Sequence, residues 1–349
     1  MDSRTDQRSL PDSGGGAASP VPTHVVGLAP VFTDPLWRIS VRLNPVEVDL
    51  LRTRPLRRLH FVAHGGASTL STLQSYSRLE HTLGVLALVA HFRPEDELLR
   101  AAALLHDIGH LPMSHTFEGT AGLNHHALGA QSVRTAPVRP VLEKHGIDAG
   151  AVVALLDGQP PSPLTGHPGL LNLDHLDSYV RSGRAAGRLD ADPAAILARL
   201  DLKDGAVSAD RDTAATLVDL VCAEARLHTS WDNVGPVSVV RRLARQLLDD
   251  TPLTPAELAR LTDPQLWTAF DSCATTRAES AMIRYEPHRL HVIAGRAPKD
   301  RPGWDFSLRK IYSSAPLVDG ERIEASAPGL AAELTALRSL PTDFHVWWS

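Results

Sequence analysis

The sequence predicts a mainly α-helical protein with a short β-hairpin and a small α+β segment after about residue 286. Apolar residues recur at the i, i+3, i+4 and i+7 spacing of a buried helix face in three stretches: 98–105, 214–225 and 240–247. Asp204-Gly205 stands between alternating residues, which predicts a tight hairpin turn. These patterns favour a helical bundle in which sheet structure is secondary.

Local signals place several helix starts. Asn44 precedes Pro45, and Thr254-Pro255 and Asp263-Pro264 have the same character. A capping side chain followed by proline is typical of a first helical turn, because proline has no N–H to satisfy and a preset φ angle. We therefore expect helices to begin at these three points.

Changes in composition and apolar periodicity divide the chain into three parts. Residues 1–30 contain a Gly-, Ser-, Ala- and Pro-rich run without apolar periodicity, which predicts a flexible N-terminal arm. Residues 31–285 form the predicted helical domain. Residues 286–349 form a predicted α+β subdomain, with strands at 291–293 and 310–312, a turn at Asp319-Gly320, and a helix at 330–340.

Composition excludes several classes of protein. Hydrophobic residues make up 43% and charged residues 21% of the 349 residues, which excludes a disordered or fibrous chain. The net charge of -5 argues against broad nucleic-acid binding. Two distant cysteines, no signal-peptide pattern and no run of about 18 apolar residues predict a cytoplasmic protein without membrane spans.

One segment concentrates chemistry-bearing side chains. An apolar helix ends at His106-Asp107, and His110 and His115 follow across a turn marked by Gly109. A lone His-Asp pair is common, and a histidine at a helix end is also favoured by the helix dipole. Three histidines and an aspartate within ten residues instead indicate a metal site, because imidazole nitrogens and carboxylate oxygens are ligands of divalent cations.

Three ordered strings resemble those of the HD-domain phosphohydrolases. They are 78–84 (RLEHTLG), 106–115 (HDIGHLPMSH) and 173–181 (LDHLDSYVR). The resemblance is strong over residues 34–183, diffuse to 285 and weak beyond. It is closest to the branch of deoxynucleotide triphosphohydrolases and their bacterial relatives, and it implies an HD-domain helical bundle.

The resemblance also implies the site. One divalent ion (Mn²⁺, Fe²⁺, Co²⁺, Ni²⁺ or Mg²⁺) would be held by His81, His106, Asp107 and Asp174. The catalytic residues would be His110, His115 and His125, with His115 as general acid and Glu118 orienting it. Arg78, Ser178 and Arg181 would bind substrate, and Asp177 would orient a metal ligand or its own helix. His126 is interpreted as a bystander, His64 as structural or solvated, and Arg241-Arg242 as a solvated helix face.

Positions around the ligands depart from the family pattern. Ser178 stands where a Tyr is usual, His175 where a basic residue is frequent, Tyr76 where a His often precedes the arginine, and His126 where a Glu is common. All four metal-ligand positions match the family, whereas residues expected around the substrate differ. This combination predicts a hydrolase whose substrate differs from that of its relatives.

The predicted function is hydrolysis of a phosphate ester of a nucleotide or nucleotide-like small molecule by metal-activated water, either triphosphohydrolase-like or monophosphatase-like. Two alternatives stay open: a phosphodiesterase acting on cyclic or signalling nucleotides, and a non-catalytic nucleotide-binding protein. The resemblance further implies a homo-oligomer.

Overall fold

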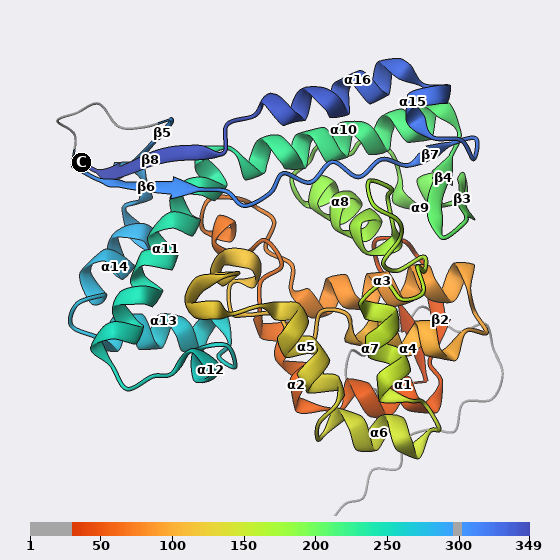
Figure 1. Cartoon of the computed structure of the whole chain (residues 1–349), viewed down its shortest axis with the longest axis horizontal. Helices are drawn as coiled ribbons and strands as arrows, with labels where there is room; N and C mark the ends of the chain where they lie inside the picture. The colour runs from red at the N-terminus through yellow and green to blue at the C-terminus, as the bar shows by residue number, and fades with distance from the viewer. Residues whose placement is uncertain (1–29, 296–301) are drawn as a thin grey trace, which may run out of the picture.

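The computed structural model describes residues 30–295 and 302–349, and it is mainly helical with small sheets (Figure 1). The predicted mainly α fold is confirmed. Residues 1–29, which make up almost all of the predicted N-terminal arm, lie outside the described part of the chain. Within the described ranges, no helix combines the length and the apolar character needed to cross a bilayer.

The first half of the chain builds the lobe that carries the His-Asp segment. Its strands and helices are β1 (Val31–Thr33), β2 (Ser40–Arg42), α1 (Pro45–Leu51), α2 (Arg54–Arg58), α3 (Arg78–Phe92), α4 (Glu97–Leu105), α5 (His125–Val133), α6 (Val138–Lys144), α7 (Ala149–Leu156) and α8 (Leu173–Ala185). Short 3-10 helices between them are η1 (Leu59–Phe61), η2 (Gly66–Leu70), η3 (Ser114–Phe117) and η4 (Thr120–Gly122). As predicted, α1 begins at Pro45, where Asn44 and Glu47 form a reciprocal capping box.

The second half begins with α9 (Pro193–Leu197), β3 (Leu200–Lys203), β4 (Ala206–Ala209), α10 (Arg211–His228), α11 (Trp231–Asp250), α12 (Pro255–Leu258), α13 (Asp263–Ser272) and α14 (Arg277–Tyr285). The hairpin prediction is confirmed, since β3 and β4 pair antiparallel around Asp204 and Gly205. Both turn residues have positive φ, as this tight turn requires. The helix starts at Pro255 and Asp263 are confirmed as well.

The tail comprises η5 (Pro287–Arg289), β5 (Leu290–Ala294), β6 (Trp304–Ser307), β7 (Leu317–Val318), α15 (Ile323–Ser326), α16 (Pro328–Ala336), η6 (Leu337–Ser339) and β8 (Asp343–Trp348). The predicted strand at 291–293, the turn at Asp319-Gly320 and most of the helix at 330–340 are present. The predicted strand at 310–312 is wrong. That stretch crosses from one small sheet to another, so no neighbouring strand pairs with its backbone.

Two apolar clusters hold the fold together, and the tail contributes to both. The first cluster joins α1, α3, α4, α7, α8 and α10, and it includes Leu334 and Leu337 from the tail. The second joins α11, α13 and α14 with the antiparallel sheet of order β5-β8-β6, which contributes Leu290, Phe306 and Val346. In Figure 1, α16 lies along α10 while the β5-β8-β6 sheet lies beside α11. The domain boundary at residue 285 stays a prediction.

Candidate functional site

Three helix ends bring the predicted metal ligands together. Helix α3 begins at Arg78 with Ser77 as its N-cap, which places His81 in the first turn. Helix α4 ends at Leu105, so His106 and Asp107 follow directly from a buried apolar helix. Asp174 lies in the first turn of α8, where the N-cap Asn172 accepts the backbone N–H of His175. Because α3 packs against both α4 and α8, the four side chains meet at one point.

The ligand atoms of these four residues converge. His81 Nε2 lies 3.0 Å from Asp174 Oδ1 and 3.3 Å from His106 Nε2. Asp107 completes the group, with its carboxylate oxygens 3.4 Å from His106 Nε2 and 3.8 Å from His81 Nε2. Two imidazole nitrogens and two carboxylates at such separations form a donor set suited to a divalent transition metal or Mg²⁺.

The two imidazoles are oriented for metal binding. His106 Nδ1 lies 2.8 Å from the carbonyl oxygen of Ala103, and His81 Nδ1 lies 2.8 Å from Asp177 Oδ2. A carbonyl and a carboxylate can only accept, so each Nδ1 carries a proton, and Nε2 is the nitrogen at which a cation would bind in place of any second proton. The residues present therefore fit a bound cation.

The charged environment supports the ionised carboxylates. Burial opposes ionisation of Asp107, but Arg78 and the adjacent imidazoles outweigh it and hold the pKa of Asp107 well below its usual range. For His81, burial alone would lower the pKa. Its hydrogen bonds to Asp174 and Asp177 act against burial and raise the pKa of His81 to about 9.

A buried ionic network supports His81 from behind. Asp177 accepts hydrogen bonds from His81, from the indole N–H of Trp37 at 2.7 Å and from Arg181 at 2.8 and 2.9 Å. Arg181 also donates to Asp34 at 2.9 Å and is 4% exposed. The structure thus does not bring Arg181 into the cavity, contrary to the predicted substrate contact, because two carboxylates already engage its guanidinium. Asp177 bonds His81 Nδ1 and so orients a predicted metal ligand, which was one of the two roles predicted for it.

The three predicted catalytic histidines form one cluster. His110 stacks on His125 with ring centroids 4.4 Å apart, and His115 meets them edge-on at 4.7 and 5.0 Å. His110 Nε2 lies 3.0 Å from Asp107 Oδ1, which links the cluster to the metal ligands. Glu118 bonds His125 Nδ1 at 2.7 Å, so the prediction that Glu118 orients His115 is wrong. Glu118 precedes the turns of η4 that return the chain to His125, and this brings the two side chains together.

Arg78 lies between the ligands and the cavity. Its guanidinium donates to Asp107 Oδ2 at 2.9 Å, to Ser114 Oγ at 2.8 Å and to the His64 carbonyl at 3.3 Å. Although Arg78 is only 3% exposed, it lines the same cavity as the histidines. A phosphate contact by Arg78 stays a prediction.

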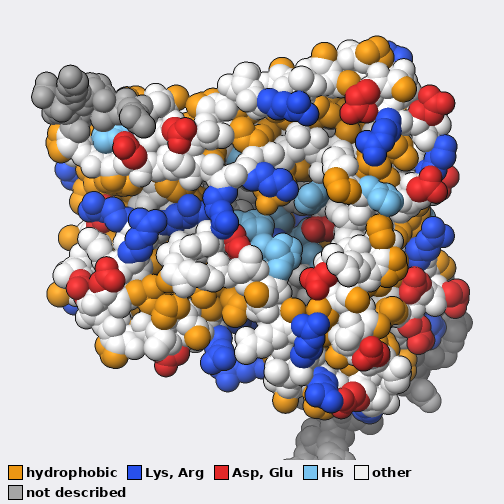
Figure 2. Space-filling model, viewed as in Figure 1, with side chains coloured by type: hydrophobic (Ala, Val, Ile, Leu, Met, Phe, Trp, Pro, Cys, Tyr) orange, Lys and Arg blue, Asp and Glu red, His pale blue; other side chains and the backbone are white. Residues whose placement is uncertain are grey.

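These residues line a cavity of about 990 Å³. Figure 2 shows histidine side chains gathered at the bottom of a hollow in the middle of this face, with lysine and arginine side chains at its border. Ser178, His175 and Tyr179 come from α8, and Tyr312 comes from the tail. The cavity has the volume expected for a small-molecule site.

Several residues of this wall were not predicted. His64 lines the cavity, packs its ring 4.6 Å from that of His81 and bonds the hydroxyl of Tyr76 at 3.0 Å. Arg241 lines the cavity instead of a solvated helix face, and its Nε donates to the Thr116 carbonyl. Arg241 lies four residues after the buried Val237, on the same face of the helix, and this spacing could have predicted that Arg241 faces inward. The tail residues Arg309 to Tyr312 carry no periodicity that could have revealed them.

A glycine contact sets the position of the histidine cluster. A Cβ added to Gly109 would overlap the carbonyl oxygen of His125 and the backbone nitrogen of Gly129. Gly129, on the other side of this contact, has more space: a Cβ added there would lie 3.6 Å from the Gly109 nitrogen, an ordinary van der Waals distance. Gly109 therefore allows α5 to approach the His-Asp turn closely.

We expect Gly109→Ala to lower both stability and turnover, because backbone atoms must move to admit the methyl group. The cost should be about 1–3 kcal/mol, as for other overpacked sites, and kcat should fall as His125 is displaced. Gly129→Ala is the matched control, and it should be neutral or stabilising by up to about 1 kcal/mol through helix propensity. Thermal unfolding and steady-state kinetics measure both; equal behaviour of the two variants would contradict the role of this contact.

Comparison with known proteins agrees with this geometry. The HD domain family model matches residues 78–169, from the first residue of α3 to the loop before α8. The metal-dependent phosphohydrolase cns2 of Cordyceps militaris is 26% identical over 274 residues, covering 73% of this chain and 77% of the fungal protein. Residues 78–169 thus match the HD domain, and most of the chain is similar to a metal-dependent phosphohydrolase. Within the HD domain match lie His81, His106, Asp107 and the histidine cluster, whereas Asp174 follows it.

The other similarities of this chain are shorter or concern the fold. Mouse deoxynucleoside triphosphate triphosphohydrolase SAMHD1 is 29% identical over 109 residues, which cover 27% of this chain and only 16% of SAMHD1. A phosphohydrolase structure from Bacteroides thetaiotaomicron superposes with a TM-score of 0.69 at 16% identity, covering 91% of this chain and 99% of that one. A hypothetical protein from Aquifex aeolicus gives 0.66 at 18% identity, covering 91% and 96%. These two structures show that the fold is shared along most of the chain.

Proposed function

We propose that this metal-dependent HD phosphohydrolase cleaves a phosphate ester of a nucleotide or nucleotide-like substrate. The observation that carries the proposal is the convergence of His81, His106, Asp107 and Asp174 beside three clustered histidines, at a cavity of about 990 Å³ that His106, Asp107 and Asp174 line. Such a cavity can enclose a nucleoside as well as its phosphate. The similarity to SAMHD1, a deoxynucleoside triphosphate triphosphohydrolase, supports a nucleotide substrate.

His81, His106, Asp107 and Asp174 would hold the cation. When bound, a divalent ion lowers the pKa of a water and neutralises charge on a phosphate. The protein's own part is to orient both imidazoles through their Nδ1 atoms, by the bonds to Asp177 and Ala103, so that both Nε2 atoms face the place of the cation. Mn²⁺, Fe²⁺, Co²⁺, Ni²⁺ and Mg²⁺ all suit a mixed nitrogen and oxygen set.

The remaining groups bind the phosphate and handle the leaving oxygen. Arg78 has a planar fork that matches phosphate oxygens, and its bond to Asp107 fixes its position. His115 is the proposed general acid, because its edge is exposed to the cavity. Desolvation and the cationic neighbours hold the pKa of His115 well below its usual range. A bound phosphate would act in the opposite direction and favour the protonated imidazole needed for donation.

The nucleoside part would lie along α8 and the tail. Ser178 leaves space where an aromatic side chain is usual in relatives, and Tyr312 supplies an aromatic ring from the tail. The Tyr312 ring lies 5.7 Å from that of His175 and carries Lys310 at 4.6 Å above its face. This arrangement favours a ring system held beside the phosphate.

The test is product analysis of the purified protein with Mn²⁺ and a panel of nucleoside monophosphates, nucleoside triphosphates and cyclic nucleotides. Orthophosphate from a monophosphate, or tripolyphosphate from a triphosphate, is the expected result. A linearised nucleotide from a cyclic one would support a phosphodiesterase instead. Binding without any product beyond that of an inactivated variant would contradict hydrolysis and indicate a nucleotide-binding protein.

A further inference from the structure

A segment of the tail forms one wall of the cavity. Residues 308–314, here the crossing segment, connect β6 to the region before β7. Its first residue donates its backbone N–H to the Thr342 carbonyl at 2.8 Å. At the other end, Ala315 donates to the Gly169 carbonyl at 2.9 Å, and its own carbonyl accepts from Leu171 at 2.7 Å. Backbone bonds therefore fix both ends, and Figure 1 shows the chain running from β6 to β7 past α8.

The crossing segment brings positive charge to the cavity. Arg309 and Lys310 both line it, and neither has an ion pair with any carboxylate in the described ranges. The Arg309 guanidinium lies over Gly119, where a Cβ would overlap its Nη1. The missing side chain at Gly119 thus leaves room for this cation.

A second arginine lies on the same side of the cavity. Arg241 of α11 donates its Nε to Thr116, three residues before Gly119, and its guanidinium lies 5.2 Å from the Phe306 ring centroid. The nearby carboxylate of Glu118 is engaged by His125. Burial, and then the charges of Arg245 and Arg309, lower the pKa of Arg241, which indicates that like charges are held close together.

We propose that Arg309 and Arg241 bind a second anionic group of the substrate, distinct from the phosphate placed at Arg78. The inference rests on the proposed function and narrows its substrate class to compounds with at least two phosphate-like charges. Two guanidinium groups without carboxylate partners repel each other, and a bound phosphate removes that repulsion while matching their planar donors. The site thereby selects its substrate with residues outside the HD domain match.

The test compares binding of inorganic tripolyphosphate and orthophosphate to the full chain by calorimetry. Arg309→Gln should reduce the ratio of tripolyphosphate to orthophosphate affinity by about tenfold or more, since it removes a charge-assisted interaction. Arg241→Gln should change the ratio in the same direction. Because Arg309 is exposed and its side chain makes no hydrogen bond among the described residues, its replacement should leave the melting temperature unchanged.

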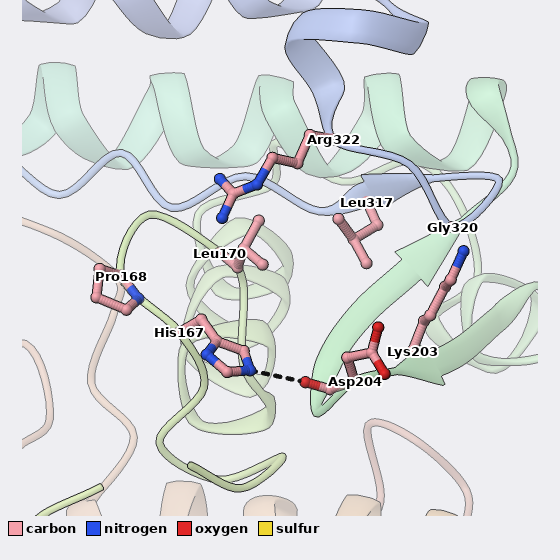
Figure 3. A pocket seen from close by; sticks show the side chains of 8 residues that line it. All are labelled: His167, Pro168, Leu170, Lys203, Asp204, Leu317, Gly320 and Arg322. Carbon is pink, nitrogen blue, oxygen red and sulfur yellow. Dashed lines mark hydrogen bonds between the residues drawn. The ribbon is translucent and has the colours of Figure 1, made fainter.

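Arg322→Gln is the matched control. Arg322 is another exposed arginine of the tail; it lines a neighbouring cavity of about 520 Å³, which shares His167 and Leu170 with the large cavity, but Arg322 itself does not line the large one. Figure 3 shows Arg322 among the residues that line this second cavity. The control should keep the affinity ratio of the unaltered protein.

An unchanged ratio in Arg309→Gln, an equal loss for both anions, or equally weak binding of both anions by the unaltered protein would overturn the proposal. None of these outcomes depends on turnover. The nucleotide product assay therefore separates failure of this inference from failure of the proposed function.

Discussion

Asp107→Asn is expected to abolish metal retention and hydrolysis together. Asp107 faces His81 and His106, and its two oxygens also bond His110 and Arg78. Loss of a bound cation removes several kcal/mol of transition-state stabilisation, which corresponds to about a thousandfold or more in kcat/KM. The measurements are metal content by elemental analysis and steady-state kinetics on whichever nucleotide the panel identifies.

The same substitution has a structural cost that must be measured separately. Arg78 would keep its charge in a buried position without its carboxylate partner, which should cost about 3 kcal/mol. Thermal unfolding shows whether the variant is folded at the assay temperature. Asp190→Asn changes an exposed aspartate after α8 and serves as the control. A folded Asp107→Asn variant that retains stoichiometric metal and normal turnover would contradict the ligand assignment.

Asp177→Asn is expected to weaken metal binding without removing any ligand atom. The new amide would place its N–H₂ toward one of the donors that Asp177 now accepts from, either at His81 or at Trp37. If the amide faces His81, it favours the tautomer whose Nε2 carries the proton, and that nitrogen can no longer bind a cation. Metal affinity should fall about 10–100-fold, as for other partners of metal ligands.

Asp34→Asn is the matched control for this variant. Asp34 is also buried and also bonds Arg181, but in the described part of the chain its carboxylate bonds Arg181 and the backbone N–H groups of Leu36 and Trp37, not His81. Both variants should lose stability, whereas only Asp177→Asn should lose metal affinity beyond that. Equal losses of metal affinity would assign the whole effect to stability.

The pH dependence of metal binding gives a further check on the same pair. The pKa of His81 is raised to about 9, so below that pH a proton competes with the cation for Nε2. Metal affinity of the unaltered protein should therefore weaken as pH falls from about 9 toward 6. In Asp177→Asn one of the two bonds that raise this pKa is lost, so the decline should begin at a lower pH. Calorimetry in buffers of different ionisation enthalpy would detect the released proton.

The parts of the fold that depend on neighbouring residues could be predicted. The cap at Asn44, the Asp204-Gly205 turn and the buried face of α10 follow from local chemistry and periodicity, and the structure confirms them. Whether residues 310–312 form a strand could not be predicted from neighbouring residues. A strand depends on a partner, and whether this stretch has one is decided by segments far away in the chain.

The site residues likewise separate into those that local motifs predict and those that depend on distant parts of the chain. Ordered motifs pointed to His81, His106 and Asp174, and the fold brings these side chains together. Arg181 was predicted to bind substrate because its partner Asp34 lies 147 residues away in the chain, so neighbouring residues could not reveal the pairing. Arg309 had no signal at all, since an isolated arginine in an irregular segment is typical of solvated surface.

The order of strands in the tail sheet bears on how the protein matures during synthesis. Strand β8 follows β5 and β6 in the chain but lies between them, pairing with both. Neither earlier strand can enter the sheet until β8 has emerged from the ribosome. Thr342, which holds the start of the crossing segment, lies next to β8 and arrives equally late. The tail sheet, and with it the anchorage of the crossing segment at Thr342, can therefore form only after the helices that carry the metal-ligand cluster have been synthesised.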